Sequence, residues 1–168
     1  MEFENKVISR EINEILWKEG HTLATAESCT GGRVAEAIIA VPGSSNYFKG
    51  GVISYVDEVK EKLLGVDPQV LAEQTAVSEE VARQMVRGAI RALNTTYAIS
   101  VTGYAGPGGG TPDVPVGTIW IACGTEEDIV TLKLTDDEGR DKNIAAATHQ
   151  ALILFLNYLK EHYTVNNA

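Results

Sequence analysis

Residues 21–40 read HTLATAESCTGGRVAEAIIA, and this stretch decides the fold class. Its first part, residues 21–26, is short and largely apolar, which predicts a strand, and residues 27–32 form a turn of small and polar residues. Residues 33–40 carry apolar side chains at helical spacing, and Pro42 and Gly43 after them favour the end of a helix. The stretch therefore predicts a strand, a turn and a helix in direct succession.

The same alternation continues outward in both directions. A helix is predicted at residues 5–19, where Ile8, Ile12, Ile15 and Leu16 share one stripe. Downstream, the patterns predict strands at 51–55, 97–102, 118–123 and 129–135, and helices at 56–64, 78–93 and 139–162. The short connection between the last two strands favours an antiparallel hairpin. This order predicts an α/β fold: a three-layer α/β/α sandwich with a mostly parallel sheet and an antiparallel edge hairpin.

Length and charge limit the kinds of partner. A chain of 168 residues without a visible linker or repeat favours one domain over residues 1–168. The net charge of −9 argues against a nucleic acid partner, because binding a phosphate backbone requires many Lys and Arg contacts. No apolar stretch approaches the ~20 residues that span a membrane, and the charged N-terminus lacks the apolar core of a signal peptide. Two cysteines without metal spacing predict a cytoplasmic protein with reduced thiols and no metal site.

The first candidate for chemistry is the turn at residues 27–32. In open sheets of this class, ligands bind beyond the carboxyl ends of the strands, and the turn directly follows a predicted strand. It exposes Ser28 and directs backbone N–H groups to one point, where they can hold a phosphate or an oxyanion. Alternatively, Ser28 or Thr30 simply caps the following helix. Cys29 is either a rival nucleophile or a small buried thiol.

Two further candidates follow the next predicted strands. At helical spacing Lys60 falls on the apolar arc of residues 56–64, where lost solvation would lower its pKa enough for a general base. Alternatively, its amine reaches solvent while its stem covers apolar surface. Tyr55 either relays a proton or is an ordinary half-buried tyrosine. The loop at 103–117 is rich in glycine and proline, and is either an anion-binding nest or a floppy surface loop.

Four longer motifs carry a resemblance to a known family. They are TAESCTGG (25–32), VPGSSNYFKGGVISYVDEVK (41–60), AVSEEVA (76–82) and SVTGYAGPGGGTPDVPVGTIW (100–120). Together with LLGV (63–66), their order and spacing resemble the CinA C-terminal domain family, the nicotinamide-nucleotide amidases, from about residue 5 to residue 160. The resemblance implies hydrolysis of nicotinamide mononucleotide to nicotinic acid mononucleotide and ammonia, in the salvage of NAD. It implies the same three-layer fold and no cofactor.

The resemblance also implies roles for particular residues. The serine of the first motif is the nucleophile, here Ser28, and a tyrosine and a lysine after the next strand complete the triad, here Tyr55 and Lys60. Substrate donors are expected in the turn and in the glycine-rich loop, with N–H groups near Thr30 and Gly31 binding the oxyanion. The expected substrate-binding residues are Thr30, Gly31, Gly32, Arg33, Thr102, Gly103, Gly106 and Arg140.

Three positions depart from the family's usual pattern. Asp57 stands where an amide is common, and its charge would raise the pKa of Lys60. Tyr104 takes the place of an isoleucine in the loop. The family often carries a second arginine four residues after the one matched by Arg140, and here Ile144 stands there. The unbroken triad still favours activity.

Partners and alternatives complete the sequence-based expectations. We expect a small-molecule nucleotide substrate and a homodimer or higher homo-oligomer. The apolar residues of the final helix form either a subunit contact or core; they are Leu152, Leu154, Phe155, Leu156 and Leu159. Two other functions stay open, a non-catalytic nucleotide-binding module with the same pocket and a hydrolase that acts on a different amide.

Overall fold

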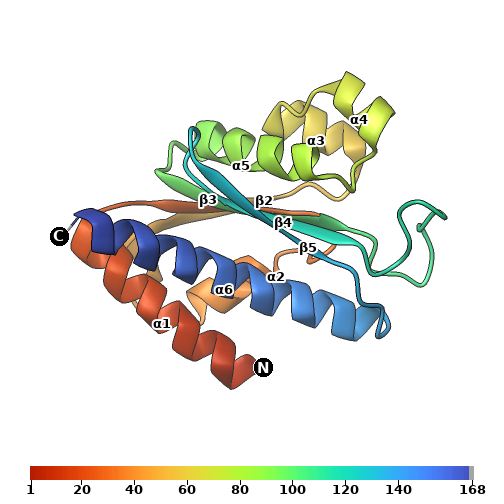
Figure 1. Cartoon of the computed structure of the whole chain (residues 1–168). Coiled ribbons are helices and arrows are strands. Elements are labelled where there is room, and N and C mark those ends of the chain that lie inside the picture. Colours follow the sequence, from red (N-terminus) through yellow and green to blue (C-terminus); the bar gives the residue numbers. More distant parts are fainter. Residues whose placement is uncertain (167–168) are drawn as a thin grey trace.

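A five-stranded sheet, in the order β2-β1-β3-β4-β5, forms the middle layer of the protein (Figure 1). The structure is a computed structural model that describes the backbone of residues 1–166 and the side chains of residues 1–163. The strands are β1 (Leu23–Glu27), β2 (Phe48–Ile53), β3 (Tyr97–Gly103), β4 (Ile119–Gly124) and β5 (Ile129–Leu134). β1 pairs in parallel with both β2 and β3, whereas β4 is antiparallel to β3 and to β5. Only β4 therefore runs against the other strands of this sheet.

Helices cover both faces of the sheet (Figure 1). One face carries α1 (Glu2–Glu19), α2 (Arg33–Ile39) and α6 (Arg140–Asn166). The other carries α3 (Asp57–Leu64), α4 (Pro68–Gln74) and α5 (Glu79–Leu93). A 3₁₀ turn, Ser44–Asn46, precedes β2. The predicted three-layer α/β/α sandwich with an antiparallel hairpin at one edge is confirmed.

The two faces of the sheet bury separate apolar clusters. Every residue of the interior strand β1 is buried, as expected for a strand covered on both sides. Toward α1 and α6, the core contains Ile12, Leu16 and Phe155, all fully buried. In α6, Leu152, Phe155, Leu156 and Leu159 are buried and Leu154 packs against them, so the core interpretation of this helix is confirmed. Within the described part of the chain, no helix is both long and apolar enough to cross a membrane.

The structure differs from the local predictions most clearly at β2 and at α4. The strand expected at 51–55 is β2, Phe48–Ile53, because pairing with β1 already begins at Phe48, opposite Leu23. Helix α4 was not predicted, although its start is well marked, since the Asp67 carboxylate accepts a hydrogen bond from the Gln69 N–H and Pro68 follows the cap.

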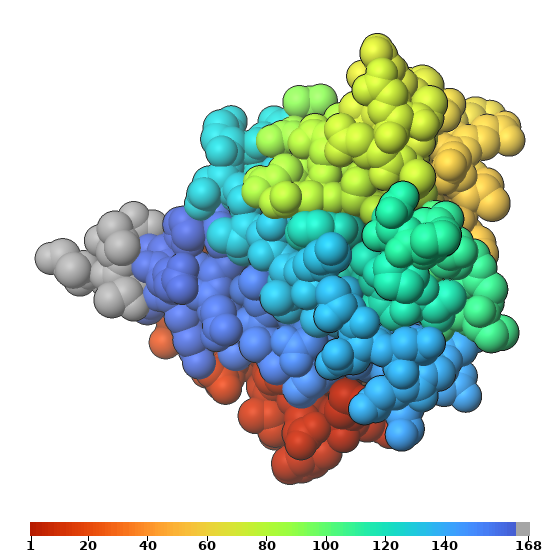
Figure 2. Space-filling view, turned by 45° about the vertical axis from the view of Figure 1, so that its right-hand side comes forward, coloured from red at the N-terminus to blue at the C-terminus, as the bar shows by residue number. Residues whose placement is uncertain are grey.

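The glycine-rich loop between β3 and β4 is held in place. Asn143 of α6 donates from Nδ2 to the Ala105 carbonyl at 3.0 Å, and Arg140 donates from Nη1 to the Gly106 carbonyl at 2.7 Å. Ala105 is buried. Figure 2 shows this loop (green) between the region of α4 above it and the start of α6 below it. The alternative of a floppy surface loop is therefore wrong for the part next to β3.

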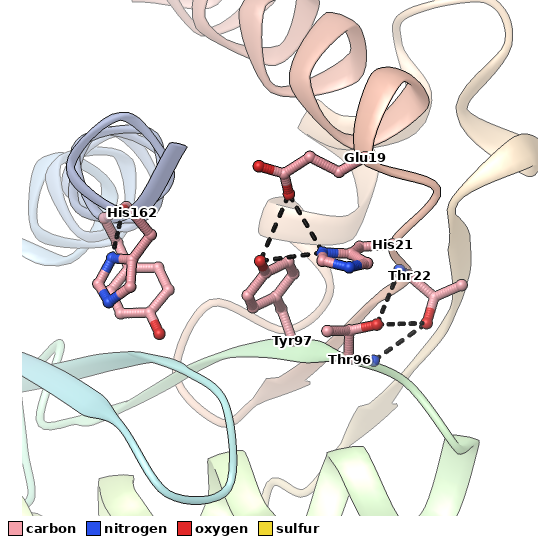
Figure 3. Close-up of polar contacts among 7 residues, drawn as sticks. Glu19, His21, Thr22, Thr96, Tyr97 and His162 are labelled. Atoms are coloured by element: carbon pink, nitrogen blue, oxygen red, sulfur yellow. Dashed lines mark hydrogen bonds and ion pairs between the residues drawn. The ribbon is translucent and has the colours of Figure 1, made fainter. Parts of the chain in front are cut away.

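The amino-terminal end of the parallel strands is closed by polar contacts (Figure 3). Tyr97, the first residue of β3, donates to the Glu19 carboxylate at 3.4 Å, and His21 Nδ1 lies 3.1 Å from each of these two groups. Burial raises the pKa of Tyr97 to about 12, so the phenol keeps its proton as a donor. Ligands of open α/β sheets bind at the opposite, carboxyl ends of the strands.

One contact near this end predicts a pH dependence of stability. His162 of α6 donates from Nδ1 to the Tyr158 carbonyl at 2.8 Å, and its Nε2 lies 2.7 Å from the Asp128 carboxylate. The hydrogen bond to Tyr158 and, after it, the contact with Asp128 raise the folded-state pKa of His162 above 6.5, although burial opposes this. The protonated ring thus stabilises the folded state at low pH, and this contribution is lost as the pH rises through the raised pKa.

We expect the free energy of unfolding of the wild type to exceed that of His162→Gln by more at about pH 5.5 than at about pH 8.5. Urea unfolding of both proteins at the two pH values measures this difference. An advantage that grows with rising pH would contradict the assignment.

Candidate active site

Ser28 lies directly beyond the carboxyl end of strand β1, between β2 and β3 in the sheet. Its N–H donates to the Val101 carbonyl at 2.9 Å, which extends the β1–β3 pairing by one residue and fixes the Ser28 backbone. The chain then turns through Gly31 and Gly32, whose φ values of 57° and 102° favour glycine. The Ser28 side chain is 7% exposed and lies 3.1 Å from Nζ of Lys60. A serine hydroxyl is thus held next to a lysine amine.

Lys60 is buried on the inner side of α3. The residue is 1% exposed, and its Nζ donates to the Ser54 carbonyl at 2.7 Å. The predicted position on the apolar arc is confirmed, since Lys60 and Leu64 are the buried residues of this helix. The amine does not reach solvent, so the alternative of a solvated head group is wrong.

The surroundings of Lys60 shift its pKa in opposing directions. Burial removes water from the ammonium form and lowers the pKa from 10.5. The negative charge of Asp57, whose Oδ1 lies 4.0 Å from Nζ, acts the other way and raises it. The burial effect is larger, so the uncharged form of the amine is more populated at a given pH than in a solvated lysine.

The three residues expected to form a triad do not all hydrogen-bond to one another. Tyr55 is 57% exposed, and its phenol oxygen accepts a hydrogen bond from Nη2 of Arg140 at 3.1 Å. Among the described residues, Arg140 is the hydrogen-bond partner of this phenol, rather than Ser28 or Lys60. Arg140 therefore connects the start of α6 to both Tyr55 and the Gly106 carbonyl.

A cleft of about 460 Å³ opens beyond the carboxyl ends of the parallel strands. It contains Ser28, Tyr55 and Lys60 together with four of the expected substrate-binding residues, Thr102, Gly103, Gly106 and Arg140. The hydroxyl of Thr102 is already engaged, since it donates to the Ala76 carbonyl at 2.8 Å. Residues that sequence analysis did not assign to the site also line the cleft, namely Leu71, Thr75, Ala76 and Val77, which belong to α4 and the segment after it.

The other four expected binding residues lie outside this cleft. The Thr30 hydroxyl donates to Glu27 at 2.8 Å, and the Gly31 N–H donates to the Ser28 carbonyl at 3.1 Å. A Cβ atom at Gly32 would contact the Ile53 side chain at 3.4 Å. Arg33 is exposed and lines a separate hollow between α1, α2 and α6. The turn therefore positions Ser28 in the cleft, whereas the four residues from Thr30 to Arg33 do not line it.

Glu27 is a structural residue that sequence analysis missed. Its buried carboxylate accepts hydrogen bonds from the Thr30 hydroxyl and from the N–H groups of Val34 and Ala35, at 2.8, 2.8 and 3.1 Å. It thereby takes the capping role, and the alternative in which Ser28 or Thr30 caps this helix is wrong. The signal was present in the sequence, since an acidic residue at the end of a buried strand, just before a helix, requires N–H partners.

We expect Glu27→Gln to lower the free energy of unfolding by about 1–3 kcal/mol, because an amide replaces a charged acceptor of three hydrogen bonds. Urea unfolding of the variant checks this. Glu36→Gln is the matched control, because Glu36 is exposed on the same helix and its replacement should change stability little. Equal stabilities of the two variants would contradict the capping role.

The thiol of Cys29 is a poor competitor for Ser28. Burial, the largest effect, raises the pKa of this thiol to about 12. The reactive thiolate is therefore scarce at neutral pH. The interpretation of Cys29 as a small buried residue fits its 9% exposure.

These observations define a class of protein: an α/β/α sandwich with a serine–lysine pair beyond the carboxyl ends of its parallel strands. The model of the CinA C-terminal domain matches residues 5–159, so the chain belongs to that family. A "CinA-like protein" from Myxococcus xanthus is 47% identical over 152 residues, which are 89% of this chain and 35% of that protein. A "putative competence-damage inducible protein" from Halothermothrix orenii is 44% identical, over 89% of this chain and 37% of the relative. The chain thus spans about a third of the length of these curated relatives.

Solved structures share the fold over nearly the whole chain. A CinA superfamily protein from Klebsiella pneumoniae 700603 has a TM-score of 0.88 at 31% identity, covering 94% of this chain and 98% of its own. A competence/damage inducible protein from Agrobacterium tumefaciens has a TM-score of 0.87 at 34% identity, covering 92% of this chain and 96% of its own. These names describe competence and damage-inducible proteins and do not state a reaction.

Proposed function

We propose that the protein is an amidohydrolase that converts nicotinamide mononucleotide to nicotinic acid mononucleotide and ammonia. The observation that carries the proposal is the contact of 3.1 Å between the Ser28 hydroxyl oxygen and the buried Lys60 amine, inside a cleft of nucleotide size. Membership of the CinA family supports it, because the motifs that resemble the amidases include both residues. The cleft lies where ligands bind in sheets of this type.

In the proposed reaction, the uncharged Lys60 amine accepts the Ser28 proton while the hydroxyl oxygen attacks the amide carbon. The Ser54 carbonyl accepts a hydrogen bond from the amine at 2.7 Å. This N–H therefore points at the carbonyl, and the nitrogen lone pair points away from the carbonyl. A bond forms between Ser28 Oγ and the carbonyl carbon, and the carbon–nitrogen bond breaks. The leaving nitrogen takes the proton from Lys60 and departs as ammonia. Water then attacks the serine ester by the reverse route and releases the acid.

The oxyanion needs N–H donors near Ser28. Of the two groups expected to provide them, the Gly31 N–H already donates to the Ser28 carbonyl. The Thr30 N–H has no backbone acceptor among the described residues and follows Ser28 by two residues, so we propose it as the donor, although the Thr30 side chain lies outside the cleft. A donor of this kind is worth ~3 kcal/mol in the transition state.

The geometry favours direct transfer between Ser28 and Lys60 over a relay through Tyr55. Because the Tyr55 phenol accepts a hydrogen bond from Arg140, we assign both residues to substrate binding rather than to proton transfer. The Arg140 guanidinium, near the Gly106 carbonyl, is the donor that we propose for the phosphate group. The reaction as written uses no metal and no cofactor.

Incubating the purified chain with nicotinamide mononucleotide tests the proposal directly. We expect stoichiometric ammonia and nicotinic acid mononucleotide. Tight binding of the nucleotide without any ammonia would contradict the proposal and would favour a nucleotide-binding module. Ammonia from other amides, but not from this nucleotide, would instead indicate a different substrate.

A further inference from the structure

Asp57 is placed to act on the ligand as well as on Lys60. It is the first residue of α3, it lines the cleft, and its carboxylate is 57% exposed to it and to solvent. Its Oδ1 lies 4.0 Å from Lys60 Nζ, which in turn lies 3.1 Å from Ser28 Oγ. The carboxylate oxygen and the nucleophile can therefore be no more than about 7 Å apart, the sum of these two distances. A ring that carries the reacting amide falls within this range.

The charges in the cleft are divided between two places. Asp57 is the one acidic residue among the described residues that line it, and Lys60 and Arg140 are the basic ones. Arg140 is tied to Tyr55 and Gly106, so its charge lies by the glycine-rich loop. When Lys60 is uncharged, as the proposed reaction requires, the negative charge beside Ser28 has no neutralising partner of its own. A cation next to the reacting amide would supply one.

We propose that Asp57 makes this site selective for amides carried on a positively charged aromatic ring, over amides on a neutral ring. The proposal rests on the proposed function, because nicotinamide linked through its ring nitrogen to a ribose is such a cation. The ring charge then lies toward Asp57 while the anionic phosphate lies toward Arg140. A specificity of this kind also disfavours free nicotinamide, whose ring is neutral.

Two forms of the same nucleotide separate charge from shape. Oxidised nicotinamide mononucleotide has a cationic ring, and reduced nicotinamide mononucleotide has a neutral ring with the same amide, ribose and phosphate. Binding of both is measured by calorimetry to the full chain carrying Ser28→Ala, in which the ligand is not consumed. Asp57→Asn is then added in this background, and Glu58→Gln is the matched control, because Glu58 is exposed on the same helix and does not line the cleft.

We expect Asp57→Asn to weaken binding of the oxidised form about fivefold, as for a partly exposed charge pair, and to leave the reduced form unchanged within error. Glu58→Gln should change neither. Equal weakening of both forms, no weakening of either, or no binding of either form would overturn the assignment of Asp57. Failure of the proposed function has a different signature, since the wild type would then release no ammonia whatever the charge at position 57.

Discussion

Replacing Ser28 with alanine should lower the rate of ammonia release from nicotinamide mononucleotide by at least about a thousandfold. The hydroxyl oxygen forms the bond to the amide carbon, and the remaining groups of the site can only bind and polarise the substrate. Substrate binding should persist, because the change removes one atom from a residue that is 7% exposed. A coupled assay for ammonia, together with calorimetric binding, measures both effects.

Cys29→Ala is the matched control for Ser28→Ala. It alters the neighbouring residue in the same turn, whose thiol is kept protonated by burial. We expect the Cys29 variant to retain most of the rate. A Ser28→Ala protein with more than about a tenth of the wild-type rate, or a Cys29→Ala protein without activity, would show that the nucleophile has been assigned incorrectly.

Replacing Lys60 with methionine should lower the rate by about 10²- to 10⁴-fold, the range for the loss of a general base. Methionine has similar length and no amine, and relief from burying a polar nitrogen offsets the lost hydrogen bond to the Ser54 carbonyl, so stability should change little. The wild-type rate should fall as the pH decreases through the lowered pKa of Lys60, because protonation removes the base. Rates against pH and urea unfolding of both proteins check these expectations.

Lys62→Met tests whether position on the helix matters. Lys62 is on the same helix, two residues later, and is exposed. Its replacement should leave both the rate and the pH profile unchanged. If Lys60→Met and Lys62→Met behaved alike, the buried amine would have no special role in the reaction.

Local patterns predicted where Ser28 and Lys60 lie in the fold but left their roles open, and the family resemblance decided between the alternatives. The strand–turn–helix pattern placed Ser28 after a buried strand, and helical spacing placed Lys60 on the apolar arc of α3. Alternation of strands and helices then required the carboxyl ends of β1 and β2 to lie side by side, as their parallel pairing shows. These features depend on residues close in sequence or on general rules of α/β topology.

Long-range contacts determined what could not be predicted. The Tyr55 phenol is held by Arg140, which is 85 residues away in the sequence, so no local pattern indicates its direction. Thr30 and Gly31 form hydrogen bonds within the turn, with Glu27 and Ser28, because a buried carboxylate and a helix start must both satisfy their polar groups. The cleft wall formed by Leu71 and residues 75–77 depends on how α4 packs beside α5.

The protonation state of Lys60 in the resting protein tests the central claim most directly. Lysine labelled with ¹⁵N at Nζ gives a resonance for each amine, and the signal that disappears in Lys60→Met identifies residue 60. Its chemical shift against pH reports the pKa without any assumption about substrate. We predict a midpoint below 10.5, the ordinary value for lysine, in accordance with its burial beside Ser28. A midpoint at or above 10.5 would mean that the amine is held as a charged group, and it would contradict its role as the base.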